Sequence, residues 1–402
     1  MKPYIYLRAL KHAEHTVFGV QDGQKTYYDA QFGQYCAYSS GQQVKRSILE
    51  DLTTSLNVQM APVTFNYNIS KDKNLENKEP WSPCDPNYID QLIGGWMRAG
   101  DGITVKRRSP LSISAMRPLH PLLSGTVKEN LTFDRSNRPD SNPVNVRMAG
   151  SDKLLTEEEI EDYLTTNNRT LPRRNWIPDN RRTQGLFVYD IAIDLRTLFS
   201  VSTNLHEPEL SKEKIADLKT KEWIECENTF GKCLVMPKKD REKVIPALAS
   251  ALLNWRITSN QARTFSLMET LAVAISENAS TISGAIRAKL IDDGEKPKAK
   301  PIIDETAGAE VFITLPCAGY IATVNESVDA LMQAEQKLIK LMMDFDYENQ
   351  TVMMAPATGF YSSKNAGTNE VRLAYVLNKE DLVKAMKCLE KGLDLYPGKI
   401  KL

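Results

Sequence analysis

The sequence predicts an α+β fold in which strands and helices alternate and long polar segments separate them. Three observations support this prediction. Residues 185–199, GLFVYDIAIDLRTLF, alternate apolar and polar side chains as a half-buried strand does. Residues 39–56 place Val44, Ile48 and Leu52 at helical spacing. Between such elements lie stretches rich in Pro, Asn, Ser and Arg, such as 133–148, that favour a projecting loop or hairpin over a packed core.

The other elements follow in order along the chain. Residues 4–10, YIYLRAL, have the aromatic and β-branched content of a strand. Residues 156–164, TEEEIEDYL, predict an acidic helix that Thr156 caps. Residues 244–255 predict a helix, 264–276 another strand, and 327–343 a helix with clear apolar spacing. A ferredoxin-like βαββαβ core with insertions between its strands accommodates this order.

The composition is that of an ordinary globular chain. Of its 402 residues, 42% are hydrophobic and 25% are charged. Lys+Arg 51 balance Asp+Glu 51, which excludes a uniformly basic nucleic-acid-binding chain. No apolar run approaches the roughly 18 residues of a membrane span, and charge interrupts the N-terminus too early for a signal peptide. We therefore expect a cytoplasmic protein without a membrane contact.

Cysteine and histidine residues give no sign of a metal centre or a catalytic group. The six cysteines form no CxxC pair, and four histidines leave little material for a zinc site or a serine-type triad. Phosphate-binding glycine motifs are absent from the sequence. These patterns predict free thiols, no metal ion and no cofactor, and they point to no particular enzyme.

The charges are segregated along the chain. Residues 104–148 hold eight Lys or Arg against three acids, a local net charge of about +5. Residues 169–182, RTLPRRNWIPDNRR, interleave arginines with Trp176, a combination that suits phosphates and stacked bases. Residues 302–346 hold eight acids against two lysines, about −6. The net charge of zero is therefore compatible with local basic sites that bind polyanions.

Three segments in this order resemble a known family. They are SSGQQVKRSILEDL (39–52) after a first strand, RRSPLSISAM (107–116) leading into an Asn-Pro loop, and GLFVYDIAIDL (185–195). Together with the SNQAR turn (259–263) before a hydrophobic strand, they resemble the crRNA-binding backbone subunit of type I CRISPR surveillance (Cascade) complexes. This is the DevR-like backbone family of the RAMP superfamily. The resemblance covers residues 1–342.

The resemblance implies a modified RNA-recognition fold as palm, with a helical finger insertion and a β-hairpin thumb. It also implies several copies stacked as a filament along one crRNA, each gripping the backbone while its thumb displaces a base. The remaining bases would pair with target DNA. Other partners would be the large subunit, the 5′-handle-capping subunit and the repeat-processing endoribonuclease. The aromatic motif of ordinary RNA-recognition modules is not evident, so base stacking on a flat sheet is not expected.

Gripping an RNA without reading its sequence requires phosphate contacts. The start of the helix over 39–56 supplies amides, cations and the positive end of the helix dipole through Ser40, Gln42, Lys45 and Arg46. The alternative is that Lys45 and Arg46 belong to a solvated helix face. Two further sets are candidates for backbone and sugar contacts, against plain strand-end and turn roles: Arg107 and Arg108, and Asn260, Gln261 and Arg263.

Four more arginines are candidates to face displaced DNA or a neighbouring subunit, against a simple solvated loop. They are Arg173, Arg174, Arg181 and Arg182. Related type III backbone subunits cut RNA with an acidic residue in a thumb loop, and Asp134 and Asp140 lie in the Asn-Pro loop. Type I backbone subunits are not nucleases, so the resemblance implies no catalysis.

The tail, residues 343–402, resembles something else. Its Gly-Phe-Tyr turn, its NEVRLAY strand and the helix after Asn378 resemble the end of a class I pyridoxal-phosphate aminotransferase, in which the counterpart of Arg372 holds the substrate carboxylate. Residues 1–342 do not resemble the large domain such an enzyme needs. We therefore interpret the tail as an appended αβ module. A coincidental end of the main fold, an aminotransferase-related enzyme and a general RNA-binding scaffold are the alternatives.

Overall fold

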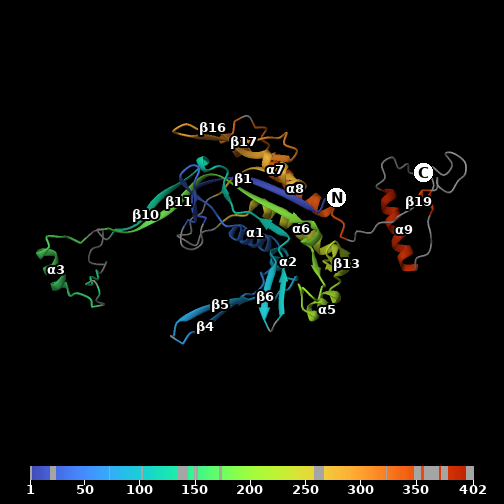
Figure 1. The fold of residues 1–402 in the computed structure, drawn as a ribbon, viewed down its shortest axis with the longest axis horizontal. Helices are drawn as coiled ribbons and strands as arrows, with labels where there is room; N and C mark the ends of the chain where they lie inside the picture. Colours follow the sequence, from blue (N-terminus) through green and yellow to red (C-terminus); the bar gives the residue numbers. More distant parts are fainter. Residues whose placement is uncertain are drawn as a thin grey trace.

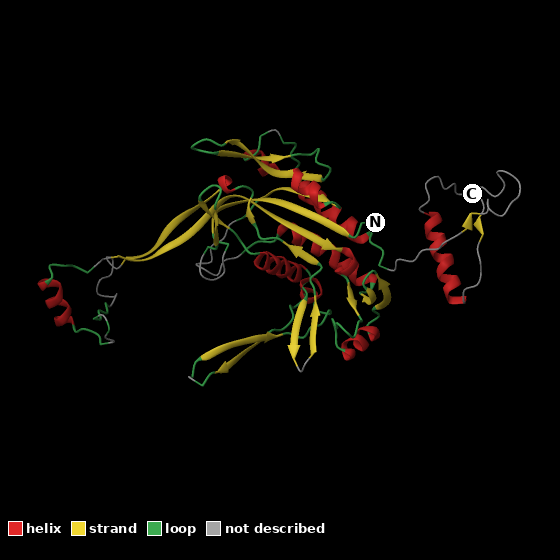
Figure 2. Ribbon diagram, viewed as in Figure 1, coloured by secondary structure: helices red, strands yellow, loops and turns green. Residues whose placement is uncertain are grey.

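The computed structural model spans residues 1–402 and describes most of them. The described residues are 2–18, 24–71, 73–100, 103–134, 144–148, 150, 153–171, 174–257, 267–322, 324–347, 355–356, 371–372 and 379–394. Helices and strands mix in sequence and in space, which confirms the α+β prediction (Figure 2).

A central antiparallel sheet has the strand order β10-β11-β1-β15-β18. These strands are β10 (Ser124–Asp134), β11 (Arg174–Asp194), β1 (Tyr4–Thr16), β15 (Thr270–Ser276) and β18 (Glu310–Ile313). Two short strands, β8 (Leu111–Ile113) and β9 (Arg117–Pro118), also pair with β11, on the side away from β1. The strand predicted at 4–10 is thus confirmed, and the one predicted at 185–199 is confirmed as far as Asp194, where helix begins at Leu195. Of the strand predicted at 264–276, residues 270–276 are strand and 264–266 lie outside the described residues.

Two helices cover one face of this sheet. They are α1 (Gly41–Ser55) and α6 (Lys238–Asn254), and α8 (Ala330–Met343) packs on α6. Val44, Ile48 and Leu52 of α1 join the core with the alternate residues of β1 and β11 that face the helices. In chain order the strands of the sheet and its two helices run β1, α1, β8, β9, β10, β11, α6, β15, β18. The helices predicted at 39–56, 244–255 and 327–343 are therefore confirmed.

The opposite face of the sheet is also covered. Leu10, Val188 and Ala274 pack there against a second apolar cluster. Its covering elements are α7 (Ala279–Ala285), the hairpin of β16 (Ile286–Asp292) and β17 (Lys298–Ile303), and the short 3-10 helices Pro121–Leu123 and Leu315–Gly319. Successive side chains along each strand therefore point alternately into the two layers, as the alternation of β11 predicts.

A long two-stranded ribbon leaves the sheet. It consists of β10 and residues 174–185 of β11, and Figure 1 shows α3 (Glu157–Thr166) beyond its far end. Gly185 lies where β11 passes from sheet to ribbon, with φ +124°, and a Cβ there would lie 2.3 Å from the Leu123 carbonyl oxygen. Thr156 caps α3 in a capping box with Glu159, as predicted. Of the segment 133–148 that the sequence predicts to project, Phe133 and Asp134 end β10 in this ribbon, and 135–143 lie outside the described residues.

The insertion between α1 and β8 differs from the helical finger that the resemblance implies. It contains β4 (Thr64–Ile69), β5 (Leu75–Trp81), α2 (Ile89–Gly94), β6 (Trp96–Gly100) and β7 (Ile103–Arg107). Among its described residues only the six of α2 are helical. Pro80, Pro83 and Pro86 disfavour helix here, because proline lacks the amide donor and clashes with the preceding turn.

The remaining elements surround this core. A hairpin of β2 (Thr26–Asp29) and β3 (Gln34–Ala37) precedes α1. Between β11 and α6 lie α4 (Leu195–Leu198), β12 (Ser200–Ser202), α5 (Lys212–Thr220), β13 (Ile224–Asn228) and β14 (Gly231–Val235). The described part of the tail contains β19 (Ala355–Pro356), β20 (Val371–Arg372) and α9 (Lys379–Asp394), so the helix predicted there is present. Phe345 and Tyr347 still pack with the main core, just beyond the expected boundary at residue 342.

Candidate nucleic-acid interface

The start of α1 is seated against the end of β8. Ser40 has extended backbone angles, and its Oγ accepts a hydrogen bond from the Gln43 amide across 3.3 Å. A Cβ on Gly41 would lie 2.6 Å from the Ile113 carbonyl oxygen, so glycine allows this close approach. The first turn holds no acidic residue to balance the positive end of the helix dipole. The start of α1 therefore favours an anion.

The cations of α1 differ in their environment. Arg46 is exposed, and its Nε donates to Oε1 of Glu50 across 2.6 Å. Lys45 is half-buried, and among the residues the structure describes no ion pair or hydrogen bond joins its ammonium to a partner. Burial lowers the pKa of Lys45. Gln42 is exposed beside them. Of the α1 candidates, Lys45 is thus the cation best placed to gain from a phosphate oxygen.

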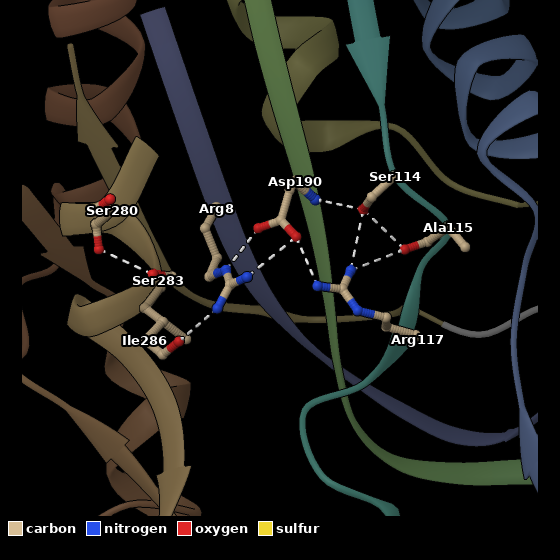
Figure 3. A network of polar contacts seen from close by, with 8 residues as sticks. All are labelled: Arg8, Ser114, Ala115, Arg117, Asp190, Ser280, Ser283 and Ile286. Carbon is tan, nitrogen blue, oxygen red and sulfur yellow. Dashed lines mark hydrogen bonds and ion pairs between the residues drawn. The ribbon is translucent and has the colours of Figure 1, made fainter. Parts of the chain in front are cut away.

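A charged network lies across the sheet next to the start of α1 (Figure 3). Arg8 of β1 donates from Nε to Oδ1 of Asp190 across 2.5 Å, and Arg117 of β9 donates from Nη2 to Oδ2 of the same carboxylate across 2.8 Å. Ser114 Oγ accepts from the Asp190 amide and from Arg117. Burial raises the pKa of Asp190, but the two arginines outweigh it and hold the pKa below its usual range.

Two guanidinium groups around one carboxylate leave this network with a net positive charge. The Arg117 side chain is 37% exposed, so part of that charge faces solvent. Ser39 connects the network to α1, because its amide donates to the Met116 carbonyl oxygen across 2.9 Å. The start of α1 and the segment 113–117 therefore adjoin, and the exposed part of Arg117 adds positive charge beside them. Arg8 is only 15% exposed and lies in the opposite layer, where its Nη1 donates to the Ile286 carbonyl oxygen.

Arg107 is buried and Arg108 is exposed. The side chain of Arg107 is only 1% exposed, and its guanidinium donates to Glu209 Oε2 and to the carbonyl oxygens of Leu92 and Thr197. The prediction that Arg107 contacts RNA is therefore wrong, because its donors are used inside the protein. Arg108, next in sequence, is exposed and stays a candidate.

Residues 174–182 of the arginine cluster lie along β11. Arg182 is buried, 9% exposed, and is thus not a surface contact for DNA or for another subunit. Arg181 is half-buried, with its guanidinium 5.8 Å from the ring centre of Tyr35. Arg174 begins β11 opposite Asp134, but its side chain is outside the description. Arg173 and Asp140 lie outside the described residues.

Other predicted residues remain untested. Asn260, Gln261 and Arg263 of the SNQAR turn lie outside the described residues. Arg372 lies in β20 opposite Ala355, and only its backbone is described. In the described part of the chain, no group of three His, Cys, Asp or Glu side chains could hold a metal ion. The same part contains no helix of the length and apolarity that crossing a bilayer requires.

Lys11 of β1 is a buried lysine that contacts Leu253 and Trp255, in the segment that precedes the SNQAR turn. Its Nζ donates to Oγ1 of Thr270 across 2.9 Å and to the Leu253 carbonyl oxygen across 3.3 Å, and it lies 5.2 Å from the ring centre of Trp255. Burial first, and Arg256 second, lower the pKa of Lys11 to about 7. Lys11 therefore titrates near neutrality in the folded protein.

Sequence reasoning missed three features of this region. Arg8 and Arg117 become a pair only because β11 places Asp190 between their strands, and no local pattern announces that. The third is the β2–β3 hairpin, whose tyrosines are exposed. A local signal existed for it, since Tyr27, Tyr28, Tyr35 and Tyr38 crowd into twelve residues of sequence.

Comparison with known proteins gives distant likenesses. No family model matches the chain, and no curated protein matches it. A chain of a structure titled "CRISPR RNA-guided surveillance complex, pre-nicking" superposes with a TM-score of 0.38 at 11% identity, covering 87% of this chain and 94% of that chain. A chain of a "CRISPR RNA-guided surveillance complex" superposes with a TM-score of 0.33 at 10% identity, covering 96% and 99%. At such TM-scores the likeness carries no functional argument.

Proposed function

We propose that this protein is a non-catalytic RNA-binding subunit that oligomerises along a CRISPR guide RNA. In this role it presents the guide for pairing with target DNA in antiviral defence, within a type I surveillance complex. The observation that carries the proposal is the start of α1. There a half-buried Lys45, with no acidic partner among the described residues, lies at the positive end of a helix whose first turn holds no acid. A phosphate oxygen supplies the missing charge.

The sequence resemblance and the fold together support one proposed path for the RNA. Under the proposal, β1, α1, β8, β11, α6 and β15 form the palm within residues 1–342. The ribbon of β10 and β11 is the thumb, the insertion between α1 and β8 is the finger, and 343–402 is an appended module. Both faces of the sheet are covered by protein. The RNA therefore follows the edge formed by the start of α1 and 113–117, where contacts go to phosphates and carry no base information.

The proposed partners follow from this arrangement. They are crRNA, target DNA through guide pairing, other copies of the chain and the remaining Cascade subunits. The acidic helix α3 at the ribbon end repels RNA, so protein is the more favourable neighbour there. The ribbon base, in contrast, carries Lys128 opposite Arg181.

RNA that copurifies with the protein tests the proposal most directly. Sequencing should recover repeat-derived guides of uniform length. Mixed cellular RNA would instead indicate a general RNA-binding scaffold. A borohydride-reducible absorbance band at about 400 nm would instead indicate the pyridoxal-phosphate enzyme that the tail resembles.

Charge reversal tests the site. The double variant Lys45→Glu and Arg46→Glu should lose filament assembly on guide RNA while the monomer stays folded. The matched control is Lys238→Glu with Lys243→Glu, which makes the same charge change on two exposed lysines near the start of α6. Equal RNA binding by the Lys45 variant and its control would contradict the site assignment.

A further inference from the structure

The hairpin of β2 and β3 exposes tyrosine side chains to solvent. Tyr28 and Tyr35 are cross-strand partners in the hairpin register. Their ring centres lie 5.3 Å apart with planes tilted by 59°. Tyr28 is 56% exposed and Tyr35 is 58% exposed, so most of both rings faces solvent. Behind them, Tyr27 and Tyr38 form an edge contact at 6.0 Å that supports the hairpin.

A cation adjoins these rings. The Arg181 guanidinium lies 5.8 Å from the centre of the Tyr35 ring, and β3 packs beside β10 at this point. Arg181 is directly opposite Lys128 in the register of the β10–β11 ribbon. A guanidinium next to an exposed ring can contact a phosphate while the ring stacks on the adjoining base.

The surface is continuous with the proposed RNA path. Tyr35 lies in β3, and the residues after Ala37 lead through Ser39 and Ser40 into α1. Ser39 and Met116 exchange backbone hydrogen bonds of 2.9 and 3.0 Å, which fixes the hairpin next to Arg117. A single-stranded RNA bound at the start of α1 therefore passes close to Tyr35, which precedes that helix by only a few residues.

Aromatic rings beside cations are the chemistry that binds single-stranded nucleic acid, because every base offers a π-face and each nucleotide a phosphate. A cross-strand aromatic pair also stabilises a hairpin. That role does not require the adjoining cation pair or the exposed faces of the rings. The combination favours a nucleic-acid ligand over a purely structural pair.

We infer that Tyr28 and Tyr35 form a stacking platform for an unpaired base of the bound RNA, with Arg181 holding the adjoining phosphate. This inference rests on the proposed function, since it concerns the same RNA. It adds a second contact, made through the bases, to the phosphate contacts at the start of α1.

The test uses the full chain and a guide-length RNA that carries 2-aminopurine, whose fluorescence falls when the base stacks. Tyr28→Leu with Tyr35→Leu should weaken RNA binding by about 5- to 100-fold and remove the quenching. Tyr28→Phe with Tyr35→Phe keeps the rings and should bind and quench as the wild type does. Tyr163→Leu on α3 removes another half-exposed tyrosine and is the control.

A measurement without substitution guards against a hairpin that fails to fold. Ultraviolet crosslinking of 4-thiouridine RNA to the wild-type protein should attach RNA to the peptide that contains Tyr28 and Tyr35. Crosslinks only elsewhere, unchanged binding by the Leu variant, or equal loss in the Phe variant would each overturn the platform. Failure of the wild-type protein to bind RNA at all would overturn the proposed function instead.

Discussion

Arg107 donates from Nη1 to Oε2 of Glu209 across 3.2 Å, and this ion pair closes the contact between the β6–β7 hairpin and the segment after β12. The Arg107 guanidinium also lies 5.5 Å from the ring centre of Trp96. In addition, Glu209 Oε2 accepts a hydrogen bond from the Ser202 amide. Arg107 is therefore a structural residue, although it stands in a basic run.

Replacing Arg107 tests this role through stability. Arg107→Ala removes the charged partner of Glu209 and the guanidinium donors to the Leu92 and Thr197 carbonyl oxygens, which should lower the free energy of unfolding by about 3–5 kcal/mol. Arg108→Ala changes an exposed neighbour and should stay within about 0.5 kcal/mol. Urea unfolding followed by circular dichroism compares them, and equal stability of the two variants would contradict the burial argument.

The salt dependence of RNA binding measures the phosphate contact of Lys45. For single strands, each lost phosphate contact reduces the slope of log K against log salt by about 0.7. Lys45→Gln should show that reduction and weaker binding at every salt concentration. Lys238→Gln, at the start of α6, should leave the slope unchanged. A slope for Lys45→Gln that matches the wild type would remove Lys45 from the site.

The Asp190 network predicts a dependence of stability on acid pH. Because Arg8 and Arg117 hold the folded pKa of Asp190 below its unfolded value of about 3.9, its contribution is complete above that pH and is lost as the pH falls through the folded pKa. Asp190→Asn should lower the free energy of unfolding at neutral pH by about 1–3 kcal/mol. The difference should shrink below about pH 4, as thermal unfolding across an acid series will show.

Lys11 should make the stability of the protein depend on pH in the alkaline range. Between about pH 7 and pH 10 the unfolded chain keeps the Lys11 proton and the folded chain releases it, so the stability of the wild type rises with pH relative to Lys11→Met. The difference should change by up to about 1.4 kcal/mol per pH unit. Denaturant midpoints of both proteins at several alkaline pH values measure it. A parallel pair of curves would show that Lys11 is not desolvated.

Local patterns in the sequence were sufficient for the main elements. Alternation places β11, apolar spacing places α1, α6 and α8, and the Ser40 and Thr156 caps mark helix starts, because each signal is contained within a few neighbouring residues. The insertion at 57–110 was predicted less well, since the finger expected from the resemblance is helical and the described one is mainly strand. Its β4–β5 hairpin is exposed along both strands, so it has no burial pattern from which to read a period.

The candidate site depended more strongly on tertiary structure. The sequence by itself determined the α+β class, the segregation of charge behind a net of zero, and the cations near the start of α1. Only the tertiary structure separated buried Arg107 and Arg182 from exposed Arg108, joined Arg8 to Arg117 through Asp190, and brought Arg181 to Tyr35. Burial and charge pairing depend on contacts between residues that are far apart in the chain. Neighbouring arginines therefore cannot be distinguished by local sequence, because the strand register decides which face of the sheet each side chain occupies.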